Sequence, residues 1–155
     1  YQGNHNRCTP EQTLRYLNRL SGPFLDRFDL SLEIPLPPPG ILSQHASKGE
    51  NSATVKKRVI AAHERQYRRQ KKLNARLEGR EIQKYCVLHH DDARWLEDTL
   101  VHLGLSIRAW QRLLKVARTI ADIELADQIS RQHLQEAVSY RAIDRLLIHL
   151  QKLLA

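Results

Sequence analysis

The sequence predicts a mainly α-helical protein, a helical bundle preceded by a short helix and a short strand. Apolar residues recur at helical spacing in segments that begin near Ser52, Asp91, Ser106 and Ser130. After the first 51 residues no segment has the period-two alternation of a strand. An apolar fraction of 41% in 155 residues is enough to bury one core. We therefore expect a helical domain over residues 52–155.

The first 40 residues are expected to form one helix and one strand. Thr9-Pro10-Glu11-Gln12 is a helix start, with Thr9 as the N-cap and Gln12 closing a capping box. This helix is expected to run to about Leu20, where Ser21-Gly22-Pro23 ends it. A strand is then predicted from alternating apolar residues at Phe28, Leu30, Leu32 and Ile34.

A proline-rich stretch marks a boundary after the predicted strand. Residues 35–40 contain four prolines and a glycine, which cannot continue a helix or pair as a central strand. Residues 41–51 are mostly polar and are interpreted as a flexible linker. The predicted organisation is residues 1–40, a linker over 41–51, and the helical domain over 52–155.

The helical domain is expected to open with a long helix that Ser52 caps and that ends near Gly79. A shorter turn or helix through Ile82 and Tyr85 should follow it. The long helix carries only a sparse apolar stripe, made of Val55, Val59, Tyr67, Leu73 and Leu77.

The remaining helices are predicted from their caps. Asp91 or Asp92 begins an amphipathic helix that ends at Gly104, a position suited to a left-handed cap. Ser106 begins a broadly apolar helix in which Trp110 is expected to be a core anchor. The last helix is expected to run from Ser130 to the C-terminus.

The formal net charge of +8 is concentrated in one segment. Residues 56–80 contain ten basic residues and two acids, and the rest of the chain is balanced. On a helix of about 37 Å these charges could follow a nucleic-acid backbone. A solvated helix or a contact between subunits is the alternative. Tyr67 could stack on a base, but its spacing favours the core. The predicted DNA contacts are Lys56, Lys57, Arg58, Arg65, Arg68, Arg69, Lys71, Lys72 and Arg76.

Several classes of protein are not expected. The chain has no run of 18 apolar residues and no secretory signal, so we expect a soluble cytoplasmic protein without a membrane partner. Cys8 and Cys86 lie too far apart to indicate a disulfide framework. No metal site is expected, because the candidate ligands are crowded into one short stretch, Cys86, His89, His90, Asp91 and Asp92. Methionine is absent and the chain opens on Tyr1, so we interpret it as a fragment.

Residues 21–30, Ser-Gly-Pro-Phe-Leu-Asp-Arg-Phe-Asp-Leu, follow the pattern SGP-x-LDR-x-DL. This pattern resembles the end of the AAA+ core in magnesium-chelatase-related ATPases of the ComM/YifB type. The resemblance implies that Arg27 is an arginine finger for ATP bound by the neighbouring subunit. Without the resemblance, Arg27 would be interpreted as a surface partner of Asp26 or Asp29.

A second group of segments supports the same family. Residues 105–110, 116–122 and 133–137 resemble its helical C-terminal lid, with Arg108 at the position of the sensor-2 arginine that contacts ATP. The phosphate-binding pattern G-x-x-x-x-G-K-[ST] does not occur in the sequence. The chain alone is therefore not expected to hydrolyse ATP or to bind a cofactor tightly, whereas its parent protein is expected to use ATP and Mg²⁺.

The resemblance implies a ring-forming DNA motor, expected to be a hexamer, with helicase or branch-migration activity in recombination and natural transformation. Two alternatives remain. The parent protein could remodel a protein partner, as a magnesium-chelatase subunit does, or the chain could be only a helical interaction and oligomerisation module. The basic segment favours the DNA motor, because protein remodelling does not require an unbalanced charge of +8 in residues 56–80.

Overall fold

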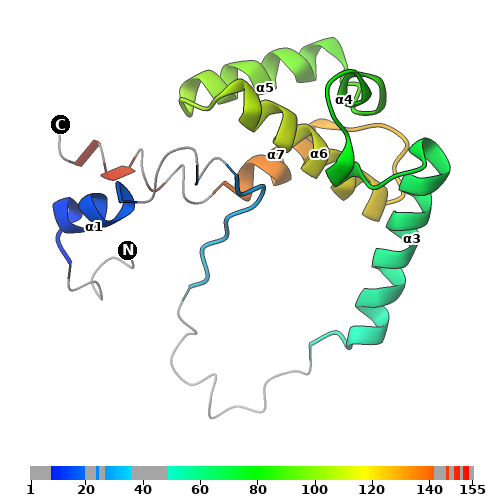
Figure 1. Cartoon of the computed structure of the whole chain (residues 1–155), viewed down its shortest axis with the longest axis horizontal. Coiled ribbons are helices and arrows are strands. Elements are labelled where there is room, and N and C mark those ends of the chain that lie inside the picture. The colour runs from blue at the N-terminus through cyan, green and yellow to red at the C-terminus, as the bar shows by residue number, and fades with distance from the viewer. Residues whose placement is uncertain are drawn as a thin grey trace.

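The computed structural model describes residues 8–19, 24, 27–35, 49–141, 146, 149–150 and 152–153. This part of the chain is mainly helical, as predicted, and Figure 1 shows the arrangement. In chain order the elements are α1 (Pro10–Leu17), α3 (Ser52–Gln70), the 3₁₀ turn η2 (Asn74–Arg76), α4 (Arg80–Tyr85), α5 (His90–His102), α6 (Ile107–Ile123) and α7 (Arg131–Ser139).

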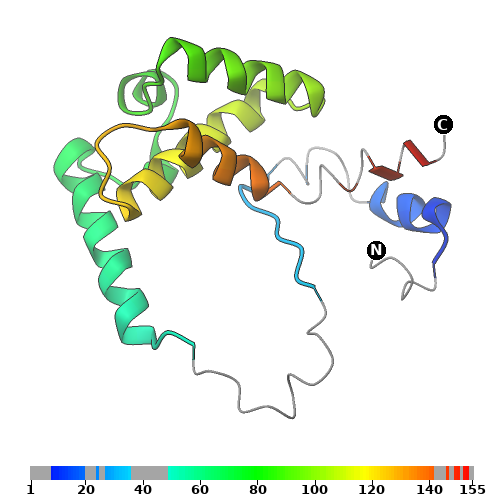
Figure 2. The ribbon, with the colours of Figure 1, turned by 180° about the vertical axis from the view of Figure 1, so that it is seen from behind.

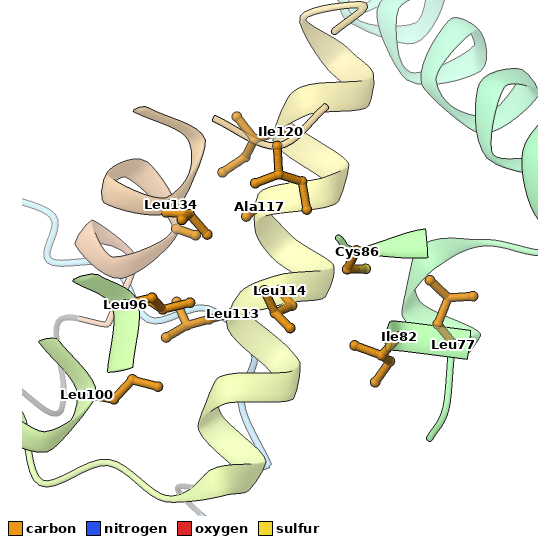
Figure 3. Close-up of a cluster of buried hydrophobic side chains, with 12 residues drawn as sticks. Leu77, Ile82, Cys86, Leu96, Leu100, Leu113, Leu114, Ala117, Ile120 and Leu134 are labelled. Carbon is orange, nitrogen blue, oxygen red and sulfur yellow. The ribbon is translucent and has the colours of Figure 1, made fainter. Parts of the chain in front are cut away.

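Helix α6 is the centre of the helical domain. It contacts α3, η2, α4 and α7. Its apolar residues interdigitate with those of its neighbours, and Figure 3 shows Leu113 directed toward Leu96 and Leu100 of α5 while Leu114 faces Ile82 of α4. Burial of this apolar surface is the main force that holds the helices together. The buried core residues are Leu77, Ile82, Cys86, Leu96, Leu100, Leu113, Leu114, Ala117, Ile120, Ile129, Leu134 and Ala137.

Most of the predicted helix caps are confirmed. The hydroxyl of Thr9 accepts from the backbone N–H of Gln12, whose side chain accepts from the N–H of Thr9. Ser106 caps α6, since its Oγ accepts from the N–H of Ala109 at 3.3 Å. Gly104 has a φ of 58°, in the left-handed region that favours glycine. These caps satisfy backbone donors and acceptors that the helix itself leaves unpaired.

The prediction that the long helix begins with a Ser52 cap and reaches Gly79 was wrong at both ends. The cap is Asn51, whose Oδ1 accepts from the N–H of Thr54 at 2.8 Å. The helix ends at Gln70, and Lys71 adopts a left-handed conformation with φ of 60°. After Lys71 the chain enters η2, where the polar contacts of Asn74 turn it back toward α3.

The side chain of Asn74 explains why α3 stops where it does. Its backbone N–H donates to Gln66 Oε1 at 2.9 Å, and its Oδ1 accepts from Gln70 Nε2 at 2.8 Å. Asn74 is itself 1% exposed. These bonds fold the chain back onto the last two turns of α3, so a continuing helix would lose them.

The buried face of α3 is mostly polar, which corrects the part of the predicted apolar stripe that lies on this helix, whereas Leu77, beyond its end, is buried in the core as predicted. Val55, Val59 and Tyr67 are 40%, 43% and 51% exposed, so Tyr67 is not a core residue. The buried side chains are instead Ala62, Gln66 and Gln70. The first half of α3 projects away from the other helices, as Figures 1 and 2 show from opposite sides.

The predicted strand over residues 28–34 is present only as an isolated bridge. Ser31 pairs in parallel with Arg141, and its N–H donates to the carbonyl of Tyr140 at 2.7 Å. A strand forms where a neighbouring stretch of backbone pairs with it along its length. In the described part of the chain, only Tyr140 and Arg141 pair with the backbone of residues 28–34. The same bridge follows the end of α7 at Ser139, so the predicted helix from Ser130 does not continue unbroken to the C-terminus.

Two sequence predictions lie largely outside the described residues. Ser21-Gly22-Pro23 is one of them, and most of the linker over residues 41–51 is the other. Within the described ranges, no helix is long and apolar enough to cross a membrane.

Candidate functional site

Arg27, the predicted arginine finger, lies in an exposed turn. Its backbone N–H donates to the carbonyl of Phe24 at 3.0 Å, which closes the turn. Asp29 is not its partner, because the Asp29 carboxylate pairs with Arg112 of α6 at 3.3 Å. Asp26 lies outside the described residues. Among the residues that are described, no carboxylate lies within ion-pair distance of Arg27, so this guanidinium is available to an anion.

Arg108, the predicted sensor-2 residue, is the second residue of α6 and is exposed. A cation in the first turn opposes the helix dipole and is slightly unfavourable there. No acidic side chain in the described ranges offsets this with an ion pair. Arg108 is therefore also available to an external anion, which would offset the unfavourable position.

The segment after Arg27 is docked on the helical domain. Arg141, 3% exposed, donates from Nη1 to the carbonyl of Phe28 at 3.0 Å. Together with the Ser31 bridge and the Asp29–Arg112 pair, this contact joins residues 28–31 to α6 and to the end of α7. These contacts link residues more than 80 positions apart, and no local pattern in the sequence indicated them.

An apolar cleft of about 390 Å³ lies beside Arg108, between α5 and the start of α6. Ile107, which precedes Arg108, is 82% exposed and lines it. Trp110 lines the same cleft and packs against the core, which confirms its predicted role as a core anchor.

The structure divides the predicted DNA-contacting residues into two groups, and the first group serves the fold. Arg69 binds Asp122 of α6 with both terminal nitrogens, at 2.6 and 2.8 Å. Arg65 donates to Asp127 at 2.6 Å and to the carbonyl of Ala126 at 3.0 Å. The prediction that these two arginines face DNA is therefore not supported by their contacts, since their charge is used inside the chain.

Asp122 is the centre of this ionic network. Burial alone would raise the pKa of its carboxyl, but hydrogen bonds from Arg69 and Asn74 and the charge of Arg118 outweigh burial and lower that pKa. Arg118 lies 3.2 Å from Asp122, and its own burial lowers the pKa of its guanidinium. A fully buried carboxylate with this many donors remains charged at neutral pH.

The second group of basic residues lies at the surface, and only Lys72 among them is half-buried. Arg58 pairs with Glu50 and Lys72 with Glu81, both at 2.6 Å, while Arg68 is 3.8 Å from Glu64. Exposed pairs of this kind are weak and can exchange for phosphate. Four further predicted DNA contacts lie at the surface with no carboxylate within 4 Å in the described part of the chain: Lys56, Lys57, Lys71 and Arg76.

The crowded histidine and acidic residues are engaged separately. His89 Nε2 lies 3.0 Å from Gln128 Oε1, and Asp92 accepts from Arg131 Nε at 2.6 Å. Cys86 is buried in the core, where desolvation raises the pKa of its thiol to about 11. The described residues contain no group of three His, Cys, Asp or Glu side chains arranged to hold a metal ion.

Comparison with known proteins agrees with this architecture. Residues 49–141 match the family described as magnesium chelatase, subunit ChlI C-terminal, and residues 1–40 match magnesium chelatase, subunit ChlI. The boundary between these matches lies in the stretch of residues 41–48.

Similar relatives occur in several bacteria. The chain is 99% identical over 155 residues to YifB of Salmonella typhimurium and 80% identical over 154 residues to YifB of Escherichia coli, covering 100% and 99% of the chain. It is 54% identical over 147 residues, 95% of the chain, to the competence protein ComM of Haemophilus influenzae. It spans 31%, 30% and 29% of these relatives, respectively. The chain therefore belongs to the magnesium-chelatase ChlI-related family and contains the C-terminal domain of that family.

Proposed function

We propose that this chain is the lid and subunit-contact part of a ring-forming AAA+ ATPase that acts on DNA in the cytoplasm. In this proposal the ring is a hexamer, residues 1–40 are the edge of the ATPase core, residues 41–51 are a linker, and residues 52–155 are the lid. The observation that carries the proposal is the exposure of Arg27 and Arg108, neither of which has an acidic partner among the described residues, on two elements that the Asp29–Arg112 pair joins.

The proposed role of these arginines follows from the chemistry of phosphoryl transfer. Negative charge develops on the phosphate oxygens, and a guanidinium supplies fixed donors that remain charged. Arg27 would contact ATP held by a neighbouring subunit, and Arg108 would contact ATP as the lid closes. ATP and Mg²⁺ would be bound by a core that contains the phosphate-binding loop. A pre-existing ion pair would weaken this role, and none is present at either residue among those described.

The ATPase proposal is tested in full-length Salmonella YifB, with residues numbered by the present sequence. Arg27→Ala should lower ATP turnover by about 10³-fold or more, with unchanged secondary structure and thermal midpoint. Arg94→Ala removes another exposed arginine, in α5, and should leave turnover unchanged. Turnover of Arg27→Ala equal to that of the unaltered protein would contradict the proposal.

The DNA proposal rests on the exposed group of basic residues rather than on the whole basic segment. Lys56 and Lys57 lie on the projecting half of α3, and Lys71 and Arg76 lie at its other end and in η2. Surface cations such as these can replace the counterions that surround a phosphate backbone. One relative, from Haemophilus influenzae, is described as a competence protein, and natural transformation is the process we propose for the present protein. Helicase or branch-migration activity in recombination is the activity that we propose the motor performs there.

The DNA proposal is tested by fluorescence anisotropy of the same full-length protein on single-stranded, duplex and branched DNA over a salt series. The double variant Lys56→Gln/Lys57→Gln should weaken binding and reduce the slope of log K against log salt by about 2 on duplex DNA. Arg15→Gln/Arg94→Gln removes the same charge elsewhere and should leave the slope unchanged. Equal slopes for both double variants would contradict a DNA contact on α3.

A second candidate function is remodelling of a protein partner, which the match to a magnesium-chelatase subunit favours. The two candidates separate in the experiments above. Loss of ATP turnover in Arg27→Ala together with absence of DNA binding at low salt would favour protein remodelling over a DNA motor.

A further inference from the structure

The turn that carries Arg27 and the helix that carries Arg108 are joined by an ion pair. Asp29 lies two residues after Arg27, and its Oδ1 is 3.3 Å from Nη1 of Arg112. Arg112 follows Arg108 by four residues in α6, so the two side chains lie on the same face, one turn apart. The pair is therefore a direct link between the two elements with the candidate ATP-contacting arginines.

Two hydrogen bonds to the backbone on either side of Asp29 support the pair. Arg141 Nη1 donates to the carbonyl of Phe28 at 3.0 Å, and the N–H of Ser31 donates to the carbonyl of Tyr140 at 2.7 Å. These bonds involve main-chain atoms on residues 28 and 31, on either side of Asp29. They hold this stretch against the end of α7, and the Asp29–Arg112 pair then sets its orientation toward α6.

We infer that Asp29 and Arg112 are positioning residues, which tie the Arg27 turn to the Arg108 helix so that both guanidinium groups move as one body. This inference rests on the proposed function of Arg27 and Arg108. Motion of the lid on one nucleotide would then carry Arg27 toward or away from the ATP of the neighbouring subunit. The pair thus provides a mechanical route for communication between adjacent ATP sites.

Because the Asp29–Arg112 pair is in contact with water, we expect it to orient the Arg27 turn rather than to contribute to folding stability. The Asp29 side chain is 52% exposed and that of Arg112 is 23% exposed, and ion pairs in contact with water contribute little to folding stability. Catalysis is far more sensitive, because a misplacement of about 1 Å can cost about 10²-fold in rate. Loss of the pair should therefore change turnover much more than it changes the thermal midpoint.

The test uses steady-state ATP hydrolysis by full-length Salmonella YifB. Asp29→Asn and Arg112→Gln should each lower kcat by about tenfold or more, with KM for ATP changed less than twofold and an unchanged thermal midpoint. The exchanged pair, Asp29→Arg with Arg112→Asp, should recover most of the lost kcat. Asp92→Asn breaks a comparable pair with Arg131 at the far end of α5 and should leave kcat unchanged.

The outcomes separate this inference from the proposed function. If Arg27→Ala abolishes turnover but Asp29→Asn and Arg112→Gln do not alter kcat, the positioning role is overturned and the ATPase proposal stands. If the single variants lower kcat and the thermal midpoint together and the exchanged pair recovers neither, the pair is only structural. Full turnover of Arg27→Ala would overturn both.

Discussion

The two halves of α3 contain similar numbers of basic residues and use them differently. From Ser52 to Ile60 every residue is exposed, including Lys56 and Lys57. From residue 61 onward the helix is docked on α6, and Arg65 and Arg69 bind carboxylates of the loop after α6 and of α6 itself. Basic residues therefore hold the fold in the docked half, through Arg65 and Arg69, whereas Lys56 and Lys57 remain available to a partner in the projecting half.

This comparison shows that the charge of a segment does not by itself define a binding surface. A guanidinium bound to a buried carboxylate contributes little to the electrostatic potential at the surface where a nucleic acid would bind, because the carboxylate balances its charge. The projecting half has no such partner beyond the Arg58–Glu50 pair in the described part of the chain. The predictions below test the division between the two halves.

The largest expected effect is the loss of the carboxylate that docks α3. Asp122→Ala leaves Arg69 and the buried Arg118 without their common partner, and removing one member of a buried ion pair costs about 3–5 kcal/mol. Urea unfolding followed by circular dichroism measures this loss. Asp127→Ala is the matched control, because its side chain is 94% exposed and its loss should cost less than about 1 kcal/mol. Equal costs for both variants would show that the buried network does not dock α3.

The second prediction concerns the contribution of Asp122 to stability at low pH. The pKa of Asp122 is lowered in the folded chain, so its contribution to stability is present above its unfolded pKa of about 4 and is lost as the pH falls through the folded value. The difference in urea midpoint between the unaltered chain and Asp122→Asn should be constant near neutral pH and shrink below about pH 4. A difference independent of pH down to pH 2 would contradict a charged Asp122.

The third prediction concerns the point where α3 ends. Lys71 has a φ of 60°, which costs free energy for a residue with a Cβ. Lys71→Gly should therefore stabilise the chain by about 1 kcal/mol, measured as an increase in the urea midpoint. Lys71→Ala retains the Cβ and should show no gain. A gain of equal size in both variants would attribute the effect to the lysine charge rather than to the backbone.

The smallest expected effect lies in the projecting half. Val59 is 43% exposed, so Val59→Ser removes little buried surface and should change stability by less than about 0.5 kcal/mol. Ala62 is the comparison on the docked face, at 3% exposed, and Ala62→Ser should destabilise the chain more because it buries a hydroxyl. A larger cost at Val59 would show that the first half of α3 is covered in solution.

Local signals were predicted well from the sequence. The capping box of α1, the Ser106 cap of α6 and the left-handed Gly104 each depend on residues within about four positions, so composition and order are sufficient to identify them. The helical class follows from periodicity for the same reason. The family motifs located Arg27 and Arg108, whose roles in ATP hydrolysis remain predictions.

Long-range features were not predicted, because they depend on which distant residues meet. The end of α3 depends on Asn74, which bonds at once to Gln66, Gln70 and Asp122. Asp122 lies 48 residues further along the chain, and no periodic pattern relates these positions. The prediction from sequence that Arg69 contacts DNA has the same cause, because its partner in the structure, Asp122, is also distant in the sequence.

The sequence by itself therefore determined the helical class, most of the caps and the family of this protein, since each rests on neighbouring residues or on motif order. Only the tertiary structure decided which cations are paired inside the fold and which lie at the surface, and that the Arg27 turn is tied to α6. The physical reason is that burial and the position of a carboxylate set the effect of a charge, and both arise only when distant segments pack together.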